Sequence, residues 1–265
     1  MNVPLALDHR DLEGATFRNG VFAVITSHSK TGLENQPFRR LTQFKLSKDT
    51  LKLEDEKSVD LRDPLMAALQ KFGQAQFGSD DWFNRIKIAD EEAGGLNIEG
   101  LSTTGDDIGE SLYVGLLGPL FGPCFANPTC PNNLTTGEAI VVKVKKPFSS
   151  EPSFEFIKLN LGNHGIKGME LIPAMKGFVI IGGPYRGQAF SLWFWDGNAG
   201  LERLDLPDTE PGNFGNLFRK LCRPEAVIPM EEKGEDMLMV FSEHSTPQCA
   251  NVPFTFIKAH YRVKK

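Results

Sequence analysis

The sequence lacks the long apolar runs that cross a bilayer. A membrane-spanning helix needs about 18 or more consecutive apolar residues, and no segment of the 265 residues approaches that length. The first ten residues also lack the basic start and apolar stretch of an export signal. We therefore expect no membrane partner and a cytoplasmic location, or a secreted protein if a leader has been removed.

No long block of lysine and arginine is present either. The chain has 29 Lys and Arg against 34 Asp and Glu, a net charge of −5. Nonspecific nucleic-acid binding depends on basic side chains that neutralise phosphates, so we expect no nucleic-acid partner. The 40% share of hydrophobic residues allows a buried core and excludes a disordered tail. A single domain over residues 1–265 is expected, because β-rich domains often reach about 250 residues.

Cysteines are few, and their spacing does not fit a zinc site. None of them forms a C-x-x-C pair or lies at zinc-finger distance from a histidine pair. The four are Cys124, Cys130, Cys222 and Cys249. Cys124 and Cys130 would form a small disulfide in a secreted protein, with Asn133 then starting a glycosylation sequon. Without an export signal, the sequence favours free thiols.

One short pattern occurs four times along the chain. It has an apolar residue or proline, then Glu or Lys, then a small residue and an apolar residue, and it lies at 11–15, 97–101, 165–169 and 223–227. Strand-like segments follow each copy. The second segments are 21–29, 111–116, 178–184 and 237–245, the third are 40–46, 139–144, 190–195 and 254–261, and the fourth are 83–88, 154–159 and 201–206. Runs of β-branched and aromatic residues broken by Gly, Asn, Asp and Pro are typical of antiparallel strands.

Four strands in each repeat predict an all-β fold, a small β-propeller of four-stranded antiparallel blades. Four blades are expected and five remain open. The short β-like segment at 3–8 is expected to complete the last blade, since a closed ring protects its edges. A lost N-terminal blade is the alternative.

The largest insertion is expected at 47–82, with a short helix at about 63–72. Asp63 would cap this helix, Pro64 fits its first turn and Gly73 would end it. Leu65 and Leu69 belong to its apolar stripe. The helix is expected either to pack on the rim of the blades or to serve as a lid or partner-binding element.

Several motifs resemble those of a known family. They are Asp11-Leu12-Glu13-Gly14, Asn97-Ile98-Glu99-Gly100-Leu101, Gly165-Ile166-Lys167, Gly182-Gly183-Pro184, Trp193-Phe194-Trp195-Asp196-Gly197 and Pro224-Glu225. With them the chain resembles the domain of unknown function 3616 family, whose members look like β-propellers. The resemblance implies a fold and no established activity. Weaker similarity links the repeats to phytase-like and esterase-like propellers, where acidic residues around the channel bind calcium and phosphate.

The chain also departs from the family pattern. Lys167 stands where the family usually has Arg, and Leu117 stands where an Arg commonly occurs. The segment 242–245 replaces an Asp-rich ending. If those Arg and Asp residues form a common site in the family, the site is altered in this chain.

The charged residue of each repeat is the main candidate for a site. In a propeller the first strand of each blade lines the channel, so Glu13, Glu99, Lys167 and Glu225 are expected at one level. Glu13, Glu99 and Glu225 are candidate ligands of Ca²⁺ or another divalent cation. The alternative is that these side chains fasten neighbouring blades by hydrogen bonds and ion pairs.

Two histidines and two arginines complete the candidates. His28 and His244 end equivalent second strands and are candidate catalytic residues, which would bind a metal or move a proton. Arg186 and Arg40 lie near predicted loops and are candidates for binding an anion, although exposed arginines are commonly solvated or paired.

The sequence contains no motif of a common catalytic machinery. G-x-S-x-G, the P-loop, G-x-G-x-x-G after a strand and H-E-x-x-H are all missing. We therefore expect a scaffold that binds a small molecule or a protein at the channel mouth. The alternative is a metal-dependent phosphoesterase or esterase-like hydrolase, in which the Glu residues hold a cation that activates water.

Overall fold

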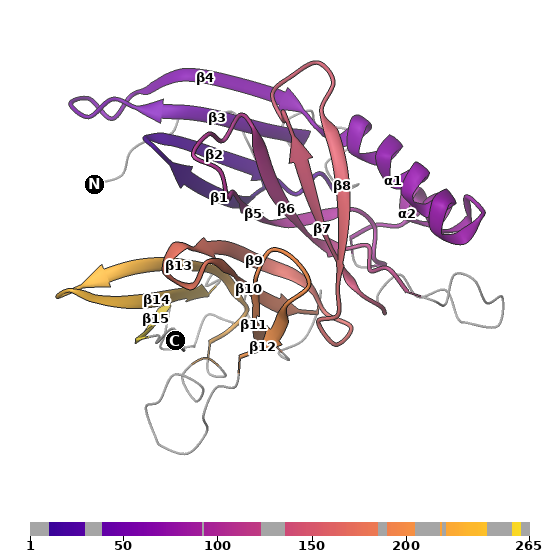
Figure 1. Ribbon diagram of the computed structural model, residues 1–265. Coiled ribbons are helices and arrows are strands. Elements are labelled where there is room, and N and C mark those ends of the chain that lie inside the picture. The colour runs from indigo at the N-terminus through magenta and orange to yellow at the C-terminus, as the bar shows by residue number, and fades with distance from the viewer. Residues whose placement is uncertain are drawn as a thin grey trace.

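The described part of the chain is mostly β and forms four antiparallel sheets (Figure 1). A computed structural model describes residues 11–29, 39–91, 93–122, 136–184, 190–204, 218, 221–242 and 256–260. In every sheet the strands lie in chain order, each beside the next. The prediction of an all-β fold is therefore confirmed at this level, while no closed ring is found among the described residues.

Each sheet begins with a strand from one repeat. The first sheet has β1 (Leu12–Arg18), β2 (Val21–Thr26), β3 (Arg40–Leu46) and β4 (Leu53–Asp60); the second has β5 (Asn97–Ser102), β6 (Ser111–Gly118), β7 (Ala139–Lys145) and β8 (Ser153–Leu159). The third has β9 (Gly165–Ile172), β10 (Gly177–Gly183), β11 (Ser191–Trp195) and β12 (Leu201–Arg203), and the fourth has β13 (Pro224–Glu232), β14 (Glu235–Ser242) and β15 (Phe256–His260). The 3₁₀ turn Pro173–Met175 joins β9 to β10.

The opening strands of the sheets lie side by side. β1 packs on β5, β5 on β9, and β9 on β13. A separate hydrophobic cluster fills each of these three sheet interfaces: Ile25 and Leu101 belong to the first, Tyr113 and Trp195 to the second. Ile181 and Val240 belong to the third. None of these clusters joins the fourth sheet to the first.

Each opening strand carries a β-bulge at the charged residue of its repeat. The paired register skips one residue between Leu12 and Gly14, between Ile98 and Gly100, between Ile166 and Gly168, and between Pro224 and Ala226. The skipped residues are Glu13, Glu99, Lys167 and Glu225. A bulge turns its residue out of the regular alternation of the strand, so the repeated pattern sets the direction of these four side chains.

The small residue after each bulge lies where the next opening strand comes close. A Cβ atom at Gly14 would lie 2.8 Å from Cβ of Leu101, and one at Gly100 would lie 3.1 Å from Cγ2 of Ile166. A Cβ at Gly168 would overlap the backbone carbonyl oxygen of Glu225. The fourth copy has Ala226, which is exposed. The series of close strand contacts therefore ends at Ala226.

The helical segment differs from its prediction at both ends. α1 covers Arg62–Phe77 rather than 63–72. The predicted strand at 83–88 is wrong, because this segment lies in α2 (Asp81–Ile88). Its buried residues Trp82, Phe83 and Ile86 follow a helical period. The predicted insertion at 47–82 also contains β4, which is the true fourth strand of the first sheet.

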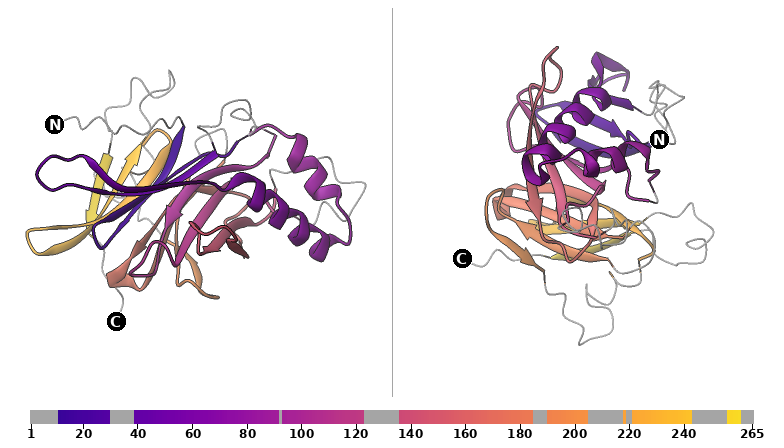
Figure 2. Two further views of the ribbon diagram at one scale, coloured as in Figure 1. Left: turned by 90° about the horizontal axis from the view of Figure 1, so that it is seen from above. Right: turned by 90° about the vertical axis from the view of Figure 1, so that its right-hand side faces the viewer.

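The helices pack on the outer strand of the second sheet. Phe72 of α1 stacks on Phe156 of β8 with ring centroids 4.6 Å apart. The helices and the fourth sheet lie at opposite ends of the molecule (Figure 2). α1 and α2 therefore cover the second sheet and lie away from the end of the strand series.

Cys222 is disulfide-bonded, and no described cysteine is free. The prediction of free thiols is therefore wrong for Cys222. Its partner is one of Cys124, Cys130 and Cys249, and all three lie outside the described residues, as does the predicted strand at 3–8. Among the described helices, none is long and apolar enough to cross a membrane.

Candidate functional site

The four bulge residues meet in one place, which we call the central cluster: Glu13, Glu99, Lys167 and Glu225. Lys167 as a whole residue is 2% exposed. Its Nζ atom lies 2.5 Å from Oε2 of Glu99 and 3.5 Å from Oε1 of Glu225. Lys167 of the third sheet therefore links the second sheet to the fourth.

Two further side chains extend the central cluster. Nδ2 of Asn97, two residues before Glu99 on β5, donates a hydrogen bond to Oε1 of Glu99 at 3.2 Å. Nη2 of Arg223 lies 3.8 Å from Oε1 of Glu225. Glu99 and Glu225 are thus each held by a cation, and Glu99 also has a neutral donor.

Burial changes the protonation of the carboxyl groups. It raises the pKa of Glu13 to about 10, and the carboxylates of Glu99 and Asp11 act in the same direction. Burial also raises the pKa of Glu99 to about 7, against the opposing effect of the Lys167 ammonium group. Desolvation favours the neutral form of an acid, so at neutral pH Glu13 holds a proton.

A cleft of about 390 Å³ opens beside the central cluster. Strands of all four sheets line it, with the residues Leu12, Glu13, Gly14, Ala15, Val24, Glu99, Leu101, Gly168, Met169, Glu170, Glu225, Ala226, Val227 and Ile228. Glu13, Glu99 and Glu225 therefore reach its wall. We call this space the central cleft.

The first and fourth sheets supply apolar walls to the central cleft. On the first sheet, Ala15 is paired with Val24, and the neighbouring pair on the same face is Phe17 with Phe22. Phe17 is 52% exposed. On the fourth sheet, Ala226 and Ile228 line the cleft, and Ile228 is 40% exposed.

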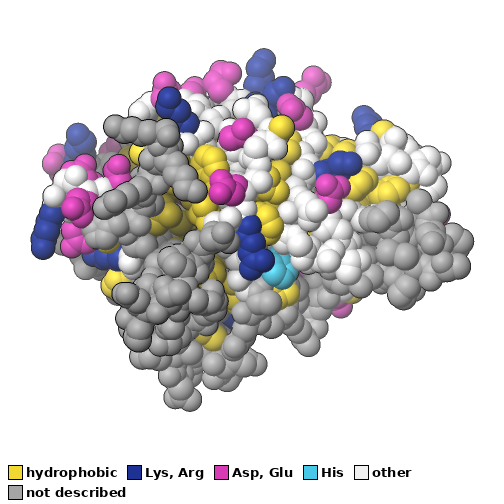
Figure 3. Space-filling view, turned by 60° about the horizontal axis from the view of Figure 1, so that its bottom comes forward, with side chains coloured by type: hydrophobic (Ala, Val, Ile, Leu, Met, Phe, Trp, Pro, Cys, Tyr) yellow, Lys and Arg dark blue, Asp and Glu magenta, His cyan; other side chains and the backbone are white. Residues whose placement is uncertain are grey.

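None of these six side chains belongs to the three hydrophobic clusters between sheets. Ala15 and Phe17 on the first sheet and Ala226 and Ile228 on the fourth are exposed, so no described residue covers these parts of the two faces. Hydrophobic side chains also gather in a band between charged ones on the face of the molecule that lies at the bottom of Figure 1, as Figure 3 shows.

The central cluster differs from a metal site in one important way. The Lys167 ammonium group lies between the carboxylates of Glu99 and Glu225, where the metal prediction expected a cation. Glu13 is neutral at neutral pH because its pKa is raised. In the described part of the chain, no group of three or more His, Cys, Asp or Glu side chains is arranged to hold a metal ion.

His28 lies in the backbone turn after β2 and is fully buried. Its φ of 56° places it in the left-handed region. Nδ1 donates to the carbonyl oxygen of Thr26 at 2.7 Å, while Nε2 has no partner in the described structure. Burial lowers the pKa of His28 to about 4, and the guanidinium groups of Arg62 and Arg39 act in the same direction.

The other predicted residues are not gathered at the central cleft. His244 and Arg186 lie outside the described residues. Arg40 begins β3, where its backbone N–H donates to Oγ1 of Thr26 at 3.0 Å. Its neighbour Arg39 forms ion pairs with Asp60 and Asp63. The predicted anion site therefore has no support from these contacts.

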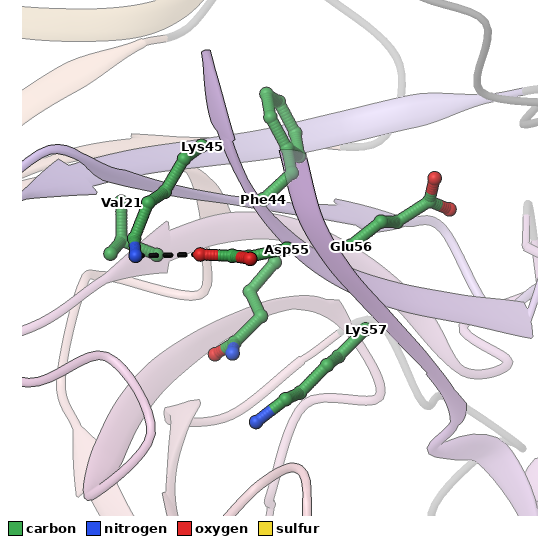
Figure 4. A pocket seen from close by; sticks show the side chains of 7 residues that line it. Val21, Phe44, Lys45, Asp55, Glu56 and Lys57 are labelled. Carbon is green, nitrogen blue, oxygen red and sulfur yellow. Dashed lines mark hydrogen bonds and ion pairs between the residues drawn. The ribbon is translucent and has the colours of Figure 1, made fainter. Parts of the chain in front are cut away.

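A second pocket of about 440 Å³ lies on the first sheet, at the end of the β3–β4 hairpin (Figure 4). Charged side chains of adjacent strands line much of it. Lys45 and Asp55 form an ion pair of 2.7 Å across the two strands. Because one sheet supplies the whole lining and Lys45 and Asp55 are already paired with each other, this pocket is a weaker candidate than the central cleft.

Sequence analysis missed several residues of the central cleft. Glu170 is one, and burial raises its pKa to about 7. Strict alternation would place Lys167 and Glu170 on opposite faces of β9, and only the bulge at Lys167 changes this count. Asn97 and Arg223 carried a weak signal, since each lies two residues before a bulge glutamate. Nothing in the sequence marked Ala15 and Ala226 as cleft residues.

Comparison with known proteins identifies no family. No protein-family model matches the chain, and no curated protein matches it. A solved structure, apo AztD from Citrobacter koseri, is similar over 97% of this chain and 76% of that chain, with 9% identity and a TM-score of 0.30. A likeness at that score carries no argument about this protein. The resemblance to the domain of unknown function 3616 family stays a prediction.

Proposed function

We propose that this protein is a noncatalytic binding protein that holds a small organic molecule in the central cleft. The observation that carries the proposal is the cleft itself, about 390 Å³ in volume and lined by all four sheets. Ligand sites are typically concave, mostly apolar and equipped with a few polar groups that fix the ligand. The walls at Val24 and Ile228 supply the apolar part, and the central cluster supplies the polar groups.

The bulges add support, because they lie at equivalent places in four sheets. Bulges are over-represented near functional sites, where they direct a side chain away from the sheet. Here each bulge directs an ionisable side chain, and three of the four line the cleft. The fourth, Lys167, holds two of the others in place.

We also propose that the four sheets are blades of a small propeller. Their strands run in chain order, and their opening strands are neighbours, as in propeller blades. In this interpretation the central cleft is the channel, which stays open between the first and fourth sheets. A ring of four blades is the proposal; a fifth blade is not needed to explain any described contact.

The metal-dependent hydrolase remains a prediction with less support. A cation held by Glu99 and Glu225 would have to displace the Lys167 ammonium group. Thermal unfolding of metal-stripped protein, with and without Ca²⁺, Mg²⁺, Mn²⁺ and Zn²⁺, tests it. A rise in melting temperature that is lost in Glu99→Gln, together with chelator-sensitive turnover of an ester, would favour the hydrolase over the binding protein.

A cleft-filling variant tests the binding function directly. Ala226 lies on the cleft wall and is exposed, so Ala226→Trp places a large ring in the cleft without disturbing a packed core. Ala67→Trp is the matched control, because Ala67 is an exposed residue of α1. Thermal-shift screening should use small organic cations, anions and neutral molecules.

We expect at least one compound to raise the melting temperature of the natural protein and of Ala67→Trp, because a ligand that binds only the folded state stabilises it. The same compound should not stabilise Ala226→Trp. A compound that stabilises both tryptophan variants equally would place binding outside the cleft and contradict the proposal.

The disulfide of Cys222 bears on the compartment. Disulfides persist in oxidising compartments and are rare in the cytosol, so we propose that the protein works outside the reducing cytosol. Thiol alkylation of protein taken directly from its cells, followed by mass spectrometry, tests this. Alkylated Cys222 in that sample would contradict the proposal.

A further inference from the structure

We infer that the central cleft takes a primary alkylammonium ion, with its alkyl chain between the first and fourth sheets and its ammonium group at Glu13. This inference rests on the proposed binding function and names the ligand class. Three observations lead to it: the apolar walls, the distribution of charge, and an unused buried acceptor.

The walls fit an alkyl chain. Ala15 and Val24 come from the first sheet, and Ala226 and Ile228 come from the fourth. When a ligand covers exposed apolar surface, the complex is stabilised by roughly 25 cal/mol for each Å² removed from water. Among the described residues, no aromatic side chain lines the cleft, so a flexible aliphatic chain fits these walls better than a flat ring that needs a stacking partner.

The charges leave one carboxyl group without a cation of its own. Lys167 and Arg223 are paired with Glu99 and Glu225. Glu170, also at the cleft, is influenced by the Arg18 guanidinium group. Glu13 forms no ion pair with a described residue. It faces the carboxylates of Glu99 and Asp11, and the Lys167 charge only partly offsets them.

A buried acceptor beside the cluster is also unsatisfied. Asn97 is 3% exposed, and its Nδ2 donates to Glu99, while its Oδ1 has no hydrogen-bond partner in the described part of the protein. Buried polar atoms are nearly always paired. Glu13 itself shares a side-chain hydrogen bond with Asp11 and has no cation as ion-pair partner among the described residues. An ammonium group has three N–H donors and no acceptor, so it suits a site that offers the Glu13 carboxylate and further oxygen acceptors.

Binding of an ammonium ion would release the proton that Glu13 holds without a ligand. Without a ligand, Glu13 stays neutral at neutral pH because its pKa is raised to about 10. A cation beside it favours the carboxylate, so binding releases a proton. Linkage then requires the affinity to rise with pH, by about tenfold for each pH unit while one proton is released.

Calorimetry with three probes of equal length tests the inference on the full chain. The probes are n-hexylammonium, 1-hexanol and hexanoate, which differ in charge and share the alkyl chain. We expect n-hexylammonium to bind best, hexanol more weakly and hexanoate not at all. The dissociation constant of n-hexylammonium should fall by about tenfold between pH 7 and 8. Titrations in buffers of different ionisation enthalpy should detect the released proton.

Glu13→Gln is the informative variant, because Gln keeps the shape of the neutral acid. It should weaken n-hexylammonium binding by about tenfold or more and leave hexanol binding unchanged, since only the charged form is lost. The pH dependence should become smaller, with the remainder due to Glu99 and Glu170, which also line the cleft and have pKa values raised to about 7. Ala226→Trp should abolish binding of both probes. Glu151→Gln, a change at an exposed residue that does not line the cleft, is a matched control and should behave like the natural protein.

The outcomes separate this inference from the binding function. Hexanol binding as tightly as n-hexylammonium in the natural protein, and failing in Ala226→Trp, would overturn the ligand class and leave the cleft as a binding site. The absence of n-hexylammonium binding would also overturn the ligand class. Binding of n-hexylammonium that survives Ala226→Trp would overturn both proposals.

Discussion

The Lys167 ammonium group lies 2.5 Å from the Glu99 carboxylate, in a place where both side chains are almost completely buried. The two residues come from different sheets and are 68 positions apart in the chain. They meet because each is the bulged residue of its strand. Their ion pair therefore reports on the relative position of two sheets and on the local backbone of both strands.

Lys167→Met should destabilise the protein by about 3–5 kcal/mol, since breaking a buried ion pair leaves an uncompensated charge. Urea unfolding at neutral pH measures the change. Lys45→Met removes an exposed pair with Asp55 and is the control, for which no measurable change is expected. A double variant with Glu99→Gln should recover part of the loss. Equal midpoints for Lys167→Met and Lys45→Met would show that the buried pair contributes little.

Glu13→Gln should make the protein more stable at neutral and alkaline pH. In the unfolded chain Glu13 loses its proton near pH 4.5, while the folded protein keeps it up to about pH 10. The folded state therefore binds the extra proton in this window, and its stability falls as pH rises. The gap between variant and natural protein should widen by at most about 1.4 kcal/mol per pH unit. Parallel unfolding curves from pH 5 to 9 would contradict the raised pKa.

His28 should make the protein sensitive to acid. Its pKa falls from an ordinary value of 6.5 to about 4 in the folded state, so between these values the unfolded chain binds more protons. Stability from this group is complete above pH 6.5 and is lost as pH falls toward 4. His28→Asn suits the left-handed backbone and should show a smaller acid loss. Chemical unfolding at several pH values measures it, and an unchanged slope would argue against a neutral buried His28.

Gly168→Ala and Ala226→Gly are opposite changes at equivalent repeat positions. The first places a methyl group against the backbone of Glu225 and should cost about 1–3 kcal/mol, as overpacking does. The second occurs at an exposed position and should cost about 0.5–1 kcal/mol, from backbone entropy alone. Thermal unfolding of both variants tests whether the strand series is tight at Gly168 and open at Ala226. A larger loss for Ala226→Gly would reverse that view.

The repeats made much of the fold predictable from sequence. Each Glu-Gly or Lys-Gly step was followed by apolar runs that became strands, as at β10, where the whole segment is buried. β4 escaped detection because five of its eight residues are charged, and intrinsic strand preference favours β-branched and aromatic residues. Segment 83–88 was predicted to be a strand because its apolar residues also suit a strand. The helical spacing of buried residues becomes visible only when Trp82, one residue before the segment, is included with Phe83 and Ile86.

The candidate site was predictable in part. The repeat placed Glu13, Glu99, Lys167 and Glu225 at one level, and the structure brings them together. The repeat did not reveal that Lys167 would lie between two glutamates, because sequence spacing does not show which charged side chains pair across sheets. The cleft walls could not be found at all, since Ala15 and Ala226 differ from core alanines only through what lies opposite them.

The three separate hydrophobic clusters also determine how the molecule should come apart. Each sheet is stabilised through its immediate neighbours, so the described sheets behave as a short linear array in which detachment of an end sheet breaks one interface and detachment of an inner sheet breaks two. Amide protons of β6 and β10 should then exchange only with global unfolding, whereas those of β14 should exchange earlier through local opening. A molecule whose end sheets can separate while the middle holds has a built-in way to admit a guest between them.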